Sequence, residues 1–167
     1  SGKVISKEEV APKYVEEETP QVAQPNAISV GGLANGSFET GDSTGWSATI
    51  SDEYGVNGED AYNGNYKCYF WGEGNQKLQQ TVKGIPNGNY TVKAVVKQNT
   101  GTPSMSRMEL SNDGGELGYV DIQHGDSYNE ISKQVNVTDG KLTVIFHQES
   151  SGEFTNLQID EVRLLGA

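Results

Sequence analysis

The chain has 167 residues, a length that fits one folded domain and a tail. Its 23 Asp and Glu residues outnumber its 12 Lys and Arg residues, and the net charge of -11 argues against binding to nucleic acid or to an anionic membrane surface. The sequence has no run of about 18 apolar residues, so it predicts no membrane-spanning segment.

Residues 1–30 differ in composition from the remainder of the chain. They contain the acidic run Glu16 to Glu18, prolines at positions 12, 20 and 25, and no clear hydrophobic periodicity. This composition is typical of an extended linker. We therefore expect a linker or tail at residues 1–30 and one folded module at residues 31–167, and we expect the linker to join the module to a larger protein.

From Leu33 onward, short apolar runs separated by Asn-Gly and Asp-Gly turns predict β-strands. Apolar and polar residues alternate within these runs, as a half-buried strand requires. The expected strands, in chain order, are residues 66–71, 78–82, 90–97, 106–110, 119–122, 131–137, 142–148 and 157–164. A chain with about eight to ten short strands and no helical stripe is predicted to be all-β, a β-sandwich (jelly roll) of two antiparallel sheets, with a closed barrel as the alternative.

The sequence carries no recognisable catalytic motif. It has two histidines, one cysteine (Cys68) and no His/Cys cluster, nucleophile elbow, P-loop or dinucleotide fingerprint. Pairs of carboxylates of the kind that a glycosidase uses are abundant in any acidic domain, and they are usually solvated surface groups. We therefore expect a binding protein, with a glycosidase or lyase domain as the alternative from another functional class.

Aromatic residues are concentrated between positions 54 and 71. Alternation within residues 66–71 places Cys68 and Phe70 on one face, and Tyr69 and Trp71 on the other. If Cys68 and Phe70 belong to the core, Tyr69 and Trp71 face outward and form a platform for the C–H face of a sugar ring. Packing of Trp71 beneath a loop is the alternative.

Polar residues of two later strands are expected on an outer face. Arg107 and Glu109 alternate with apolar Met108 and Leu110, and His147 follows the apolar Phe146. A solvated strand face explains each of these residues equally well at this stage.

Two carboxylates suggest a cation site. Glu39 and Asp160 lie within apolar, strand-like segments, and a buried carboxylate without a counter-charge is costly. No EF-hand loop is present, so a calcium site would need ligands from distant segments. The residues alone leave this question open.

Three segments, in order, resemble bacterial jelly-roll carbohydrate-binding modules. They are the opening LANGSFETGDSTGW, the middle GNYKCYFWGEGNQKLQQTVKGIPNGNYTVKAVVK and the ending TVIFHQESSGEFTNLQIDEVRLLGA, which together span residues 33–167. Within that group, the chain is most similar to the β-1,4-galactan-binding module of endo-β-1,4-galactanases.

This resemblance implies a non-catalytic module that binds β-1,4-galactan or galacto-oligosaccharide and is covalently linked to the catalytic domain of a secreted, extracellular glycoside hydrolase. It also implies a structural calcium, with carboxylates from Glu39 and Asp160 and carbonyl groups near Ser37 and Lys67. The alternatives are the same fold binding xylan or β-glucan, and a structural or adhesion β-sandwich without a sugar site.

The stereochemistry of galactose constrains the expected site. Its axial 4-hydroxyl bends a 1,4-linked chain into an open helix, so one or two aromatic rings with a polar cluster would fit the chain better than a long aromatic row. Directed donors and acceptors would then select the axial hydroxyl. The residues expected to form this site are Trp71 with Tyr69 or Tyr54, and Arg107, Glu109 and His147.

Overall fold

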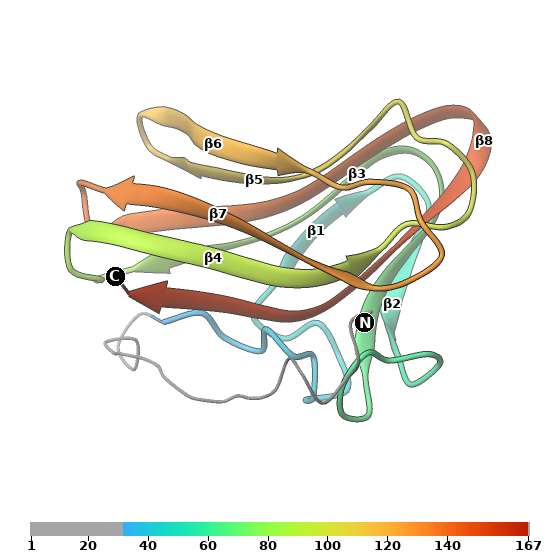
Figure 1. The fold of residues 1–167 in the computed structure, drawn as a ribbon, viewed down its shortest axis with the longest axis horizontal. Coiled ribbons are helices and arrows are strands. Elements are labelled where there is room, and N and C mark those ends of the chain that lie inside the picture. Colours follow the sequence, from blue (N-terminus) through green and yellow to red (C-terminus); the bar gives the residue numbers. More distant parts are fainter. Residues whose placement is uncertain (1–31, 167) are drawn as a thin grey trace.

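The computed structural model describes residues 32–166, so the linker expected at residues 1–30 lies outside the described residues. The described chain consists of β-strands, turns and loops (Figure 1). The strands are β1 (Ser47–Ile50), β2 (Glu53–Asn57), β3 (Lys67–Lys83), β4 (Gly88–Lys97), β5 (Met105–Asn112), β6 (Gly115–Asp121), β7 (Asn129–Val137) and β8 (Lys141–Gly166). All pairings between these strands are antiparallel.

Two long strands, β3 and β8, pass through both layers of the molecule. They pair with each other from Cys68 opposite Ile159 to Lys83 opposite Lys141. The first part of β8 also pairs with β5, and its second part pairs with β4. One layer, which we call sheet A, therefore contains β1, the second part of β3, the first part of β8, β5 and β6. The other layer, sheet B, contains β2, the first part of β3, the second part of β8, β4 and β7.

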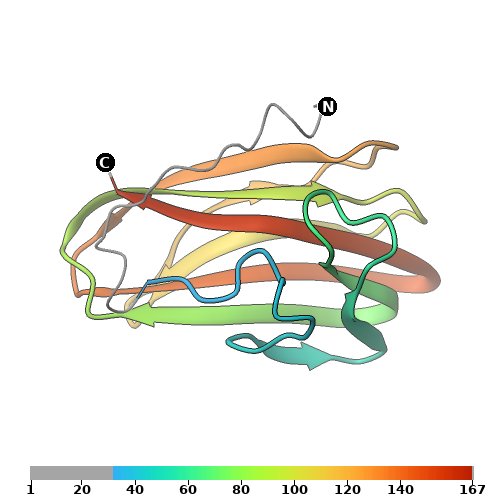
Figure 2. The ribbon, with the colours of Figure 1, turned by 90° about the horizontal axis from the view of Figure 1, so that it is seen from below.

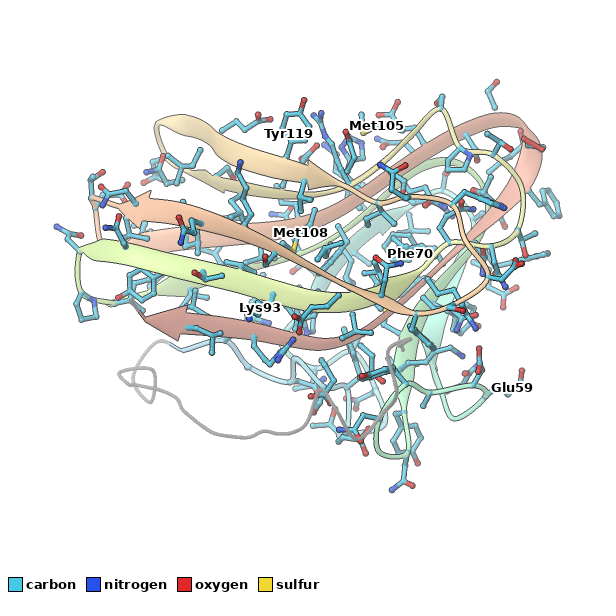
Figure 3. The ribbon with its side chains drawn as sticks, in the orientation of Figure 1. Glu59, Phe70, Lys93, Met105, Met108 and Tyr119 are labelled. Atoms are coloured by element: carbon cyan, nitrogen blue, oxygen red, sulfur yellow. The ribbon has the colours of Figure 1, made fainter. Side chains whose placement is uncertain are left out.

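Figure 2 shows the two layers, with the orange-red start of β8 in one and its dark red end in the other. This arrangement confirms the predicted jelly-roll sandwich. Its interior is apolar: Phe70 and Met108, both fully buried, lie between the layers (Figure 3). Among residues 32–166, no helix has the length and apolar character that crossing a membrane would require.

A bulge marks the bend between the two sheets. Gly72 pairs with Thr155 and Gly74 pairs with Ser150, so residues 151–154 of β8 project out of the ladder. Gly72 and Gly74 have φ values of 136° and 100°. A Cβ atom on Gly72 would lie 2.1 Å from Asp52 Oδ2, so only glycine permits this bend and the close approach of the β1–β2 loop.

The observed strands differ from the predicted ones in two respects. Residues 66–71 and 78–82 belong to one continuous strand, as do residues 142–148 and 157–164, because pairing continues across the bulge. The short strands β1 and β2 were not predicted, and each pairs only with β3 at an edge of its sheet.

Candidate functional site

A cleft of about 610 Å³ opens on the outer face of sheet B, within the range of typical small-ligand sites. Side chains from β2, β3 and β8 meet there because residues opposite each other in register share a face. Trp71 lies opposite both Glu53 and Asn156, and Tyr69 lies opposite Gln158. The lining residues are Glu53, Asn57, Glu59, Lys67, Tyr69, Phe70, Trp71, Asn99, Thr100, Asn156 and Gln158.

Exposed aromatic rings border this cleft. Trp71 is 38% exposed, and its ring packs edge-on against Phe154 with 6.0 Å between the ring centroids. Phe154 is 52% exposed and is carried outward by the β8 bulge. The Tyr69 hydroxyl donates a hydrogen bond to Glu53 Oε2 over 2.8 Å; this bond and partial burial raise the pKa of Tyr69. The cleft thus offers apolar ring surface beside an oriented carboxylate.

A buried amide, that of Asn156, fixes the part of the cleft that Asn99 and Thr100 line. Asn156 Oδ1 accepts hydrogen bonds from the backbone N–H groups of Asn99 and Thr100, at 3.0 and 2.8 Å. Its Nδ2 donates to Asn99 Oδ1 over 2.8 Å. This part of the cleft is therefore held in a single arrangement before any ligand arrives.

A buried lysine contributes to the floor. Lys67 is only 4% exposed, and its Nζ donates to Asn57 Oδ1. Burial lowers the pKa of Lys67, although the negative charges of Asp60 and Glu59 oppose that shift. Fixed amide, ammonium and carboxylate groups beside aromatic rings can hydrogen-bond the hydroxyls of a neutral sugar while its C–H face packs on a ring.

The loop that follows β2 is tied to neighbouring strands. Asp60 forms an ion pair with Lys97 of β4, and its backbone carbonyl accepts a hydrogen bond from the Tyr128 hydroxyl over 2.8 Å. Burial acts to raise the pKa of Asp60, but hydrogen bonds from Lys97 and Gln158 outweigh it and lower that pKa. The loop consequently holds Glu59 at the cleft.

The structure places Tyr54 away from the other predicted aromatic residues. Trp71 and Tyr69 line the cleft together, as alternation predicted, whereas Tyr54 pairs with the buried Phe70. Opposite residues share a face, so Tyr54 lies on the inward side of sheet B. It is still 41% exposed because β2 is an edge strand.

The structure brings Arg107, Glu109 and His147 together, but not with Trp71. Arg107 Nε donates to Glu109 Oε2 over 2.7 Å, and His147 Nδ1 lies 2.8 Å from the same oxygen. All three lie on the outer face of sheet A, whereas the cleft lies on sheet B. The bend at Gly72 and Gly74 separates the two groups.

Sequence reasoning missed most of the polar lining of the cleft. Glu53 and Asn57 belong to β2, whose five residues show no clean alternation and were not predicted as a strand. Asn156 and Gln158 lie in the long strand β8, but only its register with β3 brings them beside Trp71 and Tyr69. The Asn-Gly pairs at Gly58 and Gly64 predicted a loop after β2, but they did not indicate that this loop places Glu59 at the cleft.

The two expected calcium ligands face the same segment between β2 and β3. Asp160 is fully buried, and its carboxylate accepts the N–H groups of Asn63 and Glu161. Glu39 accepts the N–H groups of Asn65 and Tyr66. Burial, reinforced by the charges of Glu161 and Glu39, raises the pKa of Asp160 well above its ordinary range, a situation that a bound cation would relieve.

A cation at Glu39 and Asp160 would nevertheless need oxygen ligands other than these carboxylates. Within the part of the chain that the structure describes, no group of three or more His, Cys, Asp or Glu side chains is arranged to hold a metal ion. A hard cation at Glu39 and Asp160 would therefore need backbone carbonyls and water as well, which is a common pattern for calcium. With that addition, the residues present fit such an ion.

No protein-family profile matches the sequence. A Sporosarcina globispora protein named 1,6-alpha-glucosyltransferase is 33% identical over 110 residues; the match covers 64% of this chain but only 8% of that protein.

Solved structures match over a larger part of the chain. The module TmCBM61, in complex with β-1,4-galactotriose, superposes with a TM-score of 0.70 at 21% identity, covering 81% of this chain and 97% of that one. A family 16 carbohydrate-binding module superposes with a TM-score of 0.60 at 17% identity, covering 79% and 97% of the two chains. The described chain therefore has the jelly-roll fold of the carbohydrate-binding modules.

Proposed function

We propose that this chain is a non-catalytic module that binds β-1,4-galactan in the cleft at Trp71. The observation that carries the proposal is the cleft itself, in which Trp71 and Tyr69 stand beside prearranged amide and carboxylate groups. The likeness of the fold to a module that holds β-1,4-galactotriose supports this choice of ligand.

The shape of the cleft suits a short, bent stretch of chain. Its aromatic surface consists of a few rings, not a long flat row, which agrees with the helical path of a 1,4-linked galactan. Fixed polar groups penalise a sugar that leaves them unpaired, so they favour one hydroxyl stereochemistry over another.

The biological role that we propose is targeting. The module would hold an attached, secreted glycoside hydrolase on plant cell-wall polysaccharide and so raise the local substrate concentration outside the cell. The match covers only 8% of the protein named 1,6-alpha-glucosyltransferase, which is consistent with a module that works within a larger chain.

A second candidate ligand is an α-1,6-linked glucan. The observation that favours it is the 33% identity to a protein named for transfer of α-1,6-linked glucose. The cleft would serve this ligand by the same combination of ring surface and polar groups, so binding measurements must decide between the two sugars.

Calorimetric titration with galacto-, xylo-, cello- and isomalto-oligosaccharides tests the proposed ligand. We expect heat of binding from the galacto-series alone. Binding of the isomalto-series alone would favour the α-glucan candidate, and binding of xylo- or cello-oligosaccharides would move the specificity to xylan or β-glucan. No binding by any series would favour a structural or adhesion domain.

The Trp71→Ala variant tests the place of binding. We expect at least a tenfold loss of affinity, about 1.4 kcal/mol, because a central exposed aromatic ring commonly provides that much. Tyr54→Ala is the matched control, since it removes an aromatic side chain of similar exposure from the other face of the sheet. Equal affinity of both variants for galactotriose would contradict the proposed cleft.

We also propose a structural calcium ion held by the carboxylates of Glu39 and Asp160, with carbonyl oxygens near Ser37 and Lys67. Such an ion would neutralise the buried carboxylate of Asp160 and fix the segment between β2 and β3. It would stabilise the fold without contacting the sugar.

Chelation tests this ion. We expect the melting temperature to fall by roughly 5–10 °C after treatment with a chelator and to recover with added calcium, because a site near saturation contributes about 3 kcal/mol to the free energy of unfolding. The Asp160→Asn variant should show no such response. An unchanged melting temperature, together with no metal found by elemental analysis of the purified protein, would remove Glu39 and Asp160 as ligands.

A further inference from the structure

Four Asn-Gly pairs occur in the sequence, and the structure gives their asparagine amides different surroundings. The pairs begin at Asn35, Asn57, Asn63 and Asn87. In such a pair the asparagine side chain can react with the next backbone nitrogen, because glycine has no side chain that obstructs the approach. The contacts of each amide then decide which pair reacts fastest.

Asn57, the last residue of β2, has its side chain folded toward the next peptide bond. Its Oδ1 accepts a hydrogen bond from the backbone N–H of Glu59 over 3.1 Å. A bond from an asparagine oxygen to the backbone two residues later closes an Asx turn, which bends the side chain over the intervening residue. The carbonyl carbon of the side chain, Cγ, is therefore held beside the backbone nitrogen of Gly58.

The same oxygen also accepts from a charged group. Lys67 Nζ donates to Asn57 Oδ1, and Lys67 is only 4% exposed. A hydrogen bond from a charged donor is stronger than one between neutral groups, and burial reduces the screening of that charge by solvent. Lys67 therefore draws electron density toward Oδ1 and makes Cγ of Asn57 more open to attack.

Together the two donors form an arrangement like an oxyanion hole. When a nucleophile attacks Cγ, negative charge develops on Oδ1, where the Glu59 N–H and the Lys67 ammonium already point. Donors that are in place before the reaction stabilise such charge without any rearrangement.

The nitrogen that must leave is held at two of the other asparagines but not at Asn57. Among residues 32–166, Asn57 Nδ2 donates no hydrogen bond. Asn35 Nδ2 donates to two backbone carbonyls, both at 2.9 Å, and Asn63 Nδ2 donates to Glu161 Oε2 over 3.4 Å. Departure of Nδ2 would break these bonds at Asn35 and Asn63, whereas none is lost at Asn57.

Asn87 is the closest comparison, because its Nδ2 is also without a partner in the described part of the chain. Its Oδ1 accepts only from the backbone N–H of Gly140, over 2.9 Å. Asn87 thus has one neutral donor where Asn57 has a neutral donor and a charged one.

The fold itself requires the second residue of the Asn57 pair. A Cβ atom on Gly58 would lie 2.9 Å from the backbone oxygen of Asn65, so a larger residue would force the loop to shift. Figure 3 shows Glu59, the next residue, on this loop at the outside of the molecule.

We propose that Asn57 is a site of spontaneous deamidation, promoted by Lys67 and by the N–H of Glu59. The Gly58 nitrogen gives its proton to hydroxide and forms a bond to Asn57 Cγ. The bond from Cγ to Nδ2 then breaks, and Nδ2 takes a proton from water and leaves as ammonia. One water molecule opens the resulting succinimide ring at either of its two carbonyl carbons, so the product is aspartate or isoaspartate.

The product changes the cleft on sheet B. Asn57 lines that cleft, so a carboxylate at position 57 adds a negative charge there and forms an ion pair with the buried Lys67. The isoaspartate product also lengthens the backbone at the junction of β2 and the loop. The proposal rests on the contacts of Asn57 and not on the identity of any ligand.

Peptide mapping by mass spectrometry measures deamidation at all four pairs in one sample. The wild-type protein is aged in mildly alkaline buffer, both native and unfolded in urea, and the native rate at each site is divided by its own unfolded rate. We expect this ratio at Asn57 to exceed that at Asn87 by at least about tenfold, since a well-placed donor to a developing oxyanion contributes at least that much. A ratio at Asn57 no higher than that at Asn87 would overturn the proposal.

Two lysine variants separate the effect of the Lys67 contact from the effect of loop mobility. Lys67→Met should lower the Asn57 ratio to that of Asn87. Lys97→Met is the matched control, because Lys97 is also largely buried and holds the same loop, through Asp60, but does not contact Asn57. It should not slow the reaction. If mobility of the loop alone governed the rate, both substitutions would accelerate deamidation, and that result would refute the role of Lys67.

The comparison of Asn57 with Asn87 in the wild type needs no variant, so it decides the proposal even if Lys67→Met does not fold. The result is also independent of sugar binding. Slow deamidation at Asn57 would refute this proposal alone, and a lack of binding to galactotriose would refute the proposed function alone.

Discussion

Gly64 lies where two carboxylates hold the segment between β2 and β3. Asp160 accepts the N–H of Asn63, and Glu39 accepts the N–H of Asn65, so the backbone passes close to both carboxylates. Gly64 has a φ of +69°, and a Cβ atom there would lie 2.7 Å from the carboxyl carbon of Glu39. Both the backbone conformation and the contact with Glu39 therefore favour glycine at position 64.

Substitution of Gly64 should be more harmful than substitution of a glycine with the same backbone conformation. Gly84 also has a φ of +69°, but no atom lies within 4 Å of its Cβ position. We expect Gly84→Ala to lower the free energy of unfolding by about 1 kcal/mol through backbone strain, and Gly64→Ala to lower it by at least about 1 kcal/mol more. Urea titration of both variants measures the difference, and equal losses would contradict the contact with Glu39.

At the scale of elements, alternation predicted the central strands and missed the edges. The strands predicted at residues 90–97 and 131–137 correspond closely to β4 and β7, because the apolar positions of these strands face the core at a period of two. The edge strand β2 is exposed or half-buried throughout and gives no such pattern. The glycines and polar residues of the bulge interrupt the apolar pattern of β3 and β8, although their pairing continues.

The same limits explain which parts of the candidate sites could be predicted. Alternation correctly placed Tyr69, Trp71, Arg107 and Glu109 on outer faces. It could not assign them to different sheets, because that separation depends on the bend at Gly72 and Gly74. Neighbours within a face depend on register, which is fixed by the packing of the whole core and not by local sequence.

At the scale of the whole molecule, Cys68 is a built-in probe of folding. It is the only cysteine of the chain, it is fully buried, and burial raises the pKa of its thiol to about 12. It lies where β3 pairs with the second part of β8, opposite Ile159. Reagent can therefore reach a reactive thiolate only when this pairing opens.

We expect the native protein to react with a thiol reagent at least about a thousandfold more slowly than the unfolded chain, as a domain of ordinary stability requires. Mass spectrometry of labelled protein across a urea series measures the rates. The dependence of the labelling rate on urea should match that of global unfolding. Rapid labelling in buffer without urea would show that β3 and β8 separate locally.

The course of β8 has a mechanical consequence. This strand lies between β3 and β5 at residues 143–149, and its later part pairs first with β3 and then with β4, so it is paired along most of its length. A pull along β8 from its C-terminal end loads many backbone hydrogen bonds at once, in shear, instead of breaking them one after another. Tension applied at that end of β8 would therefore meet a direction in which the fold resists strand separation.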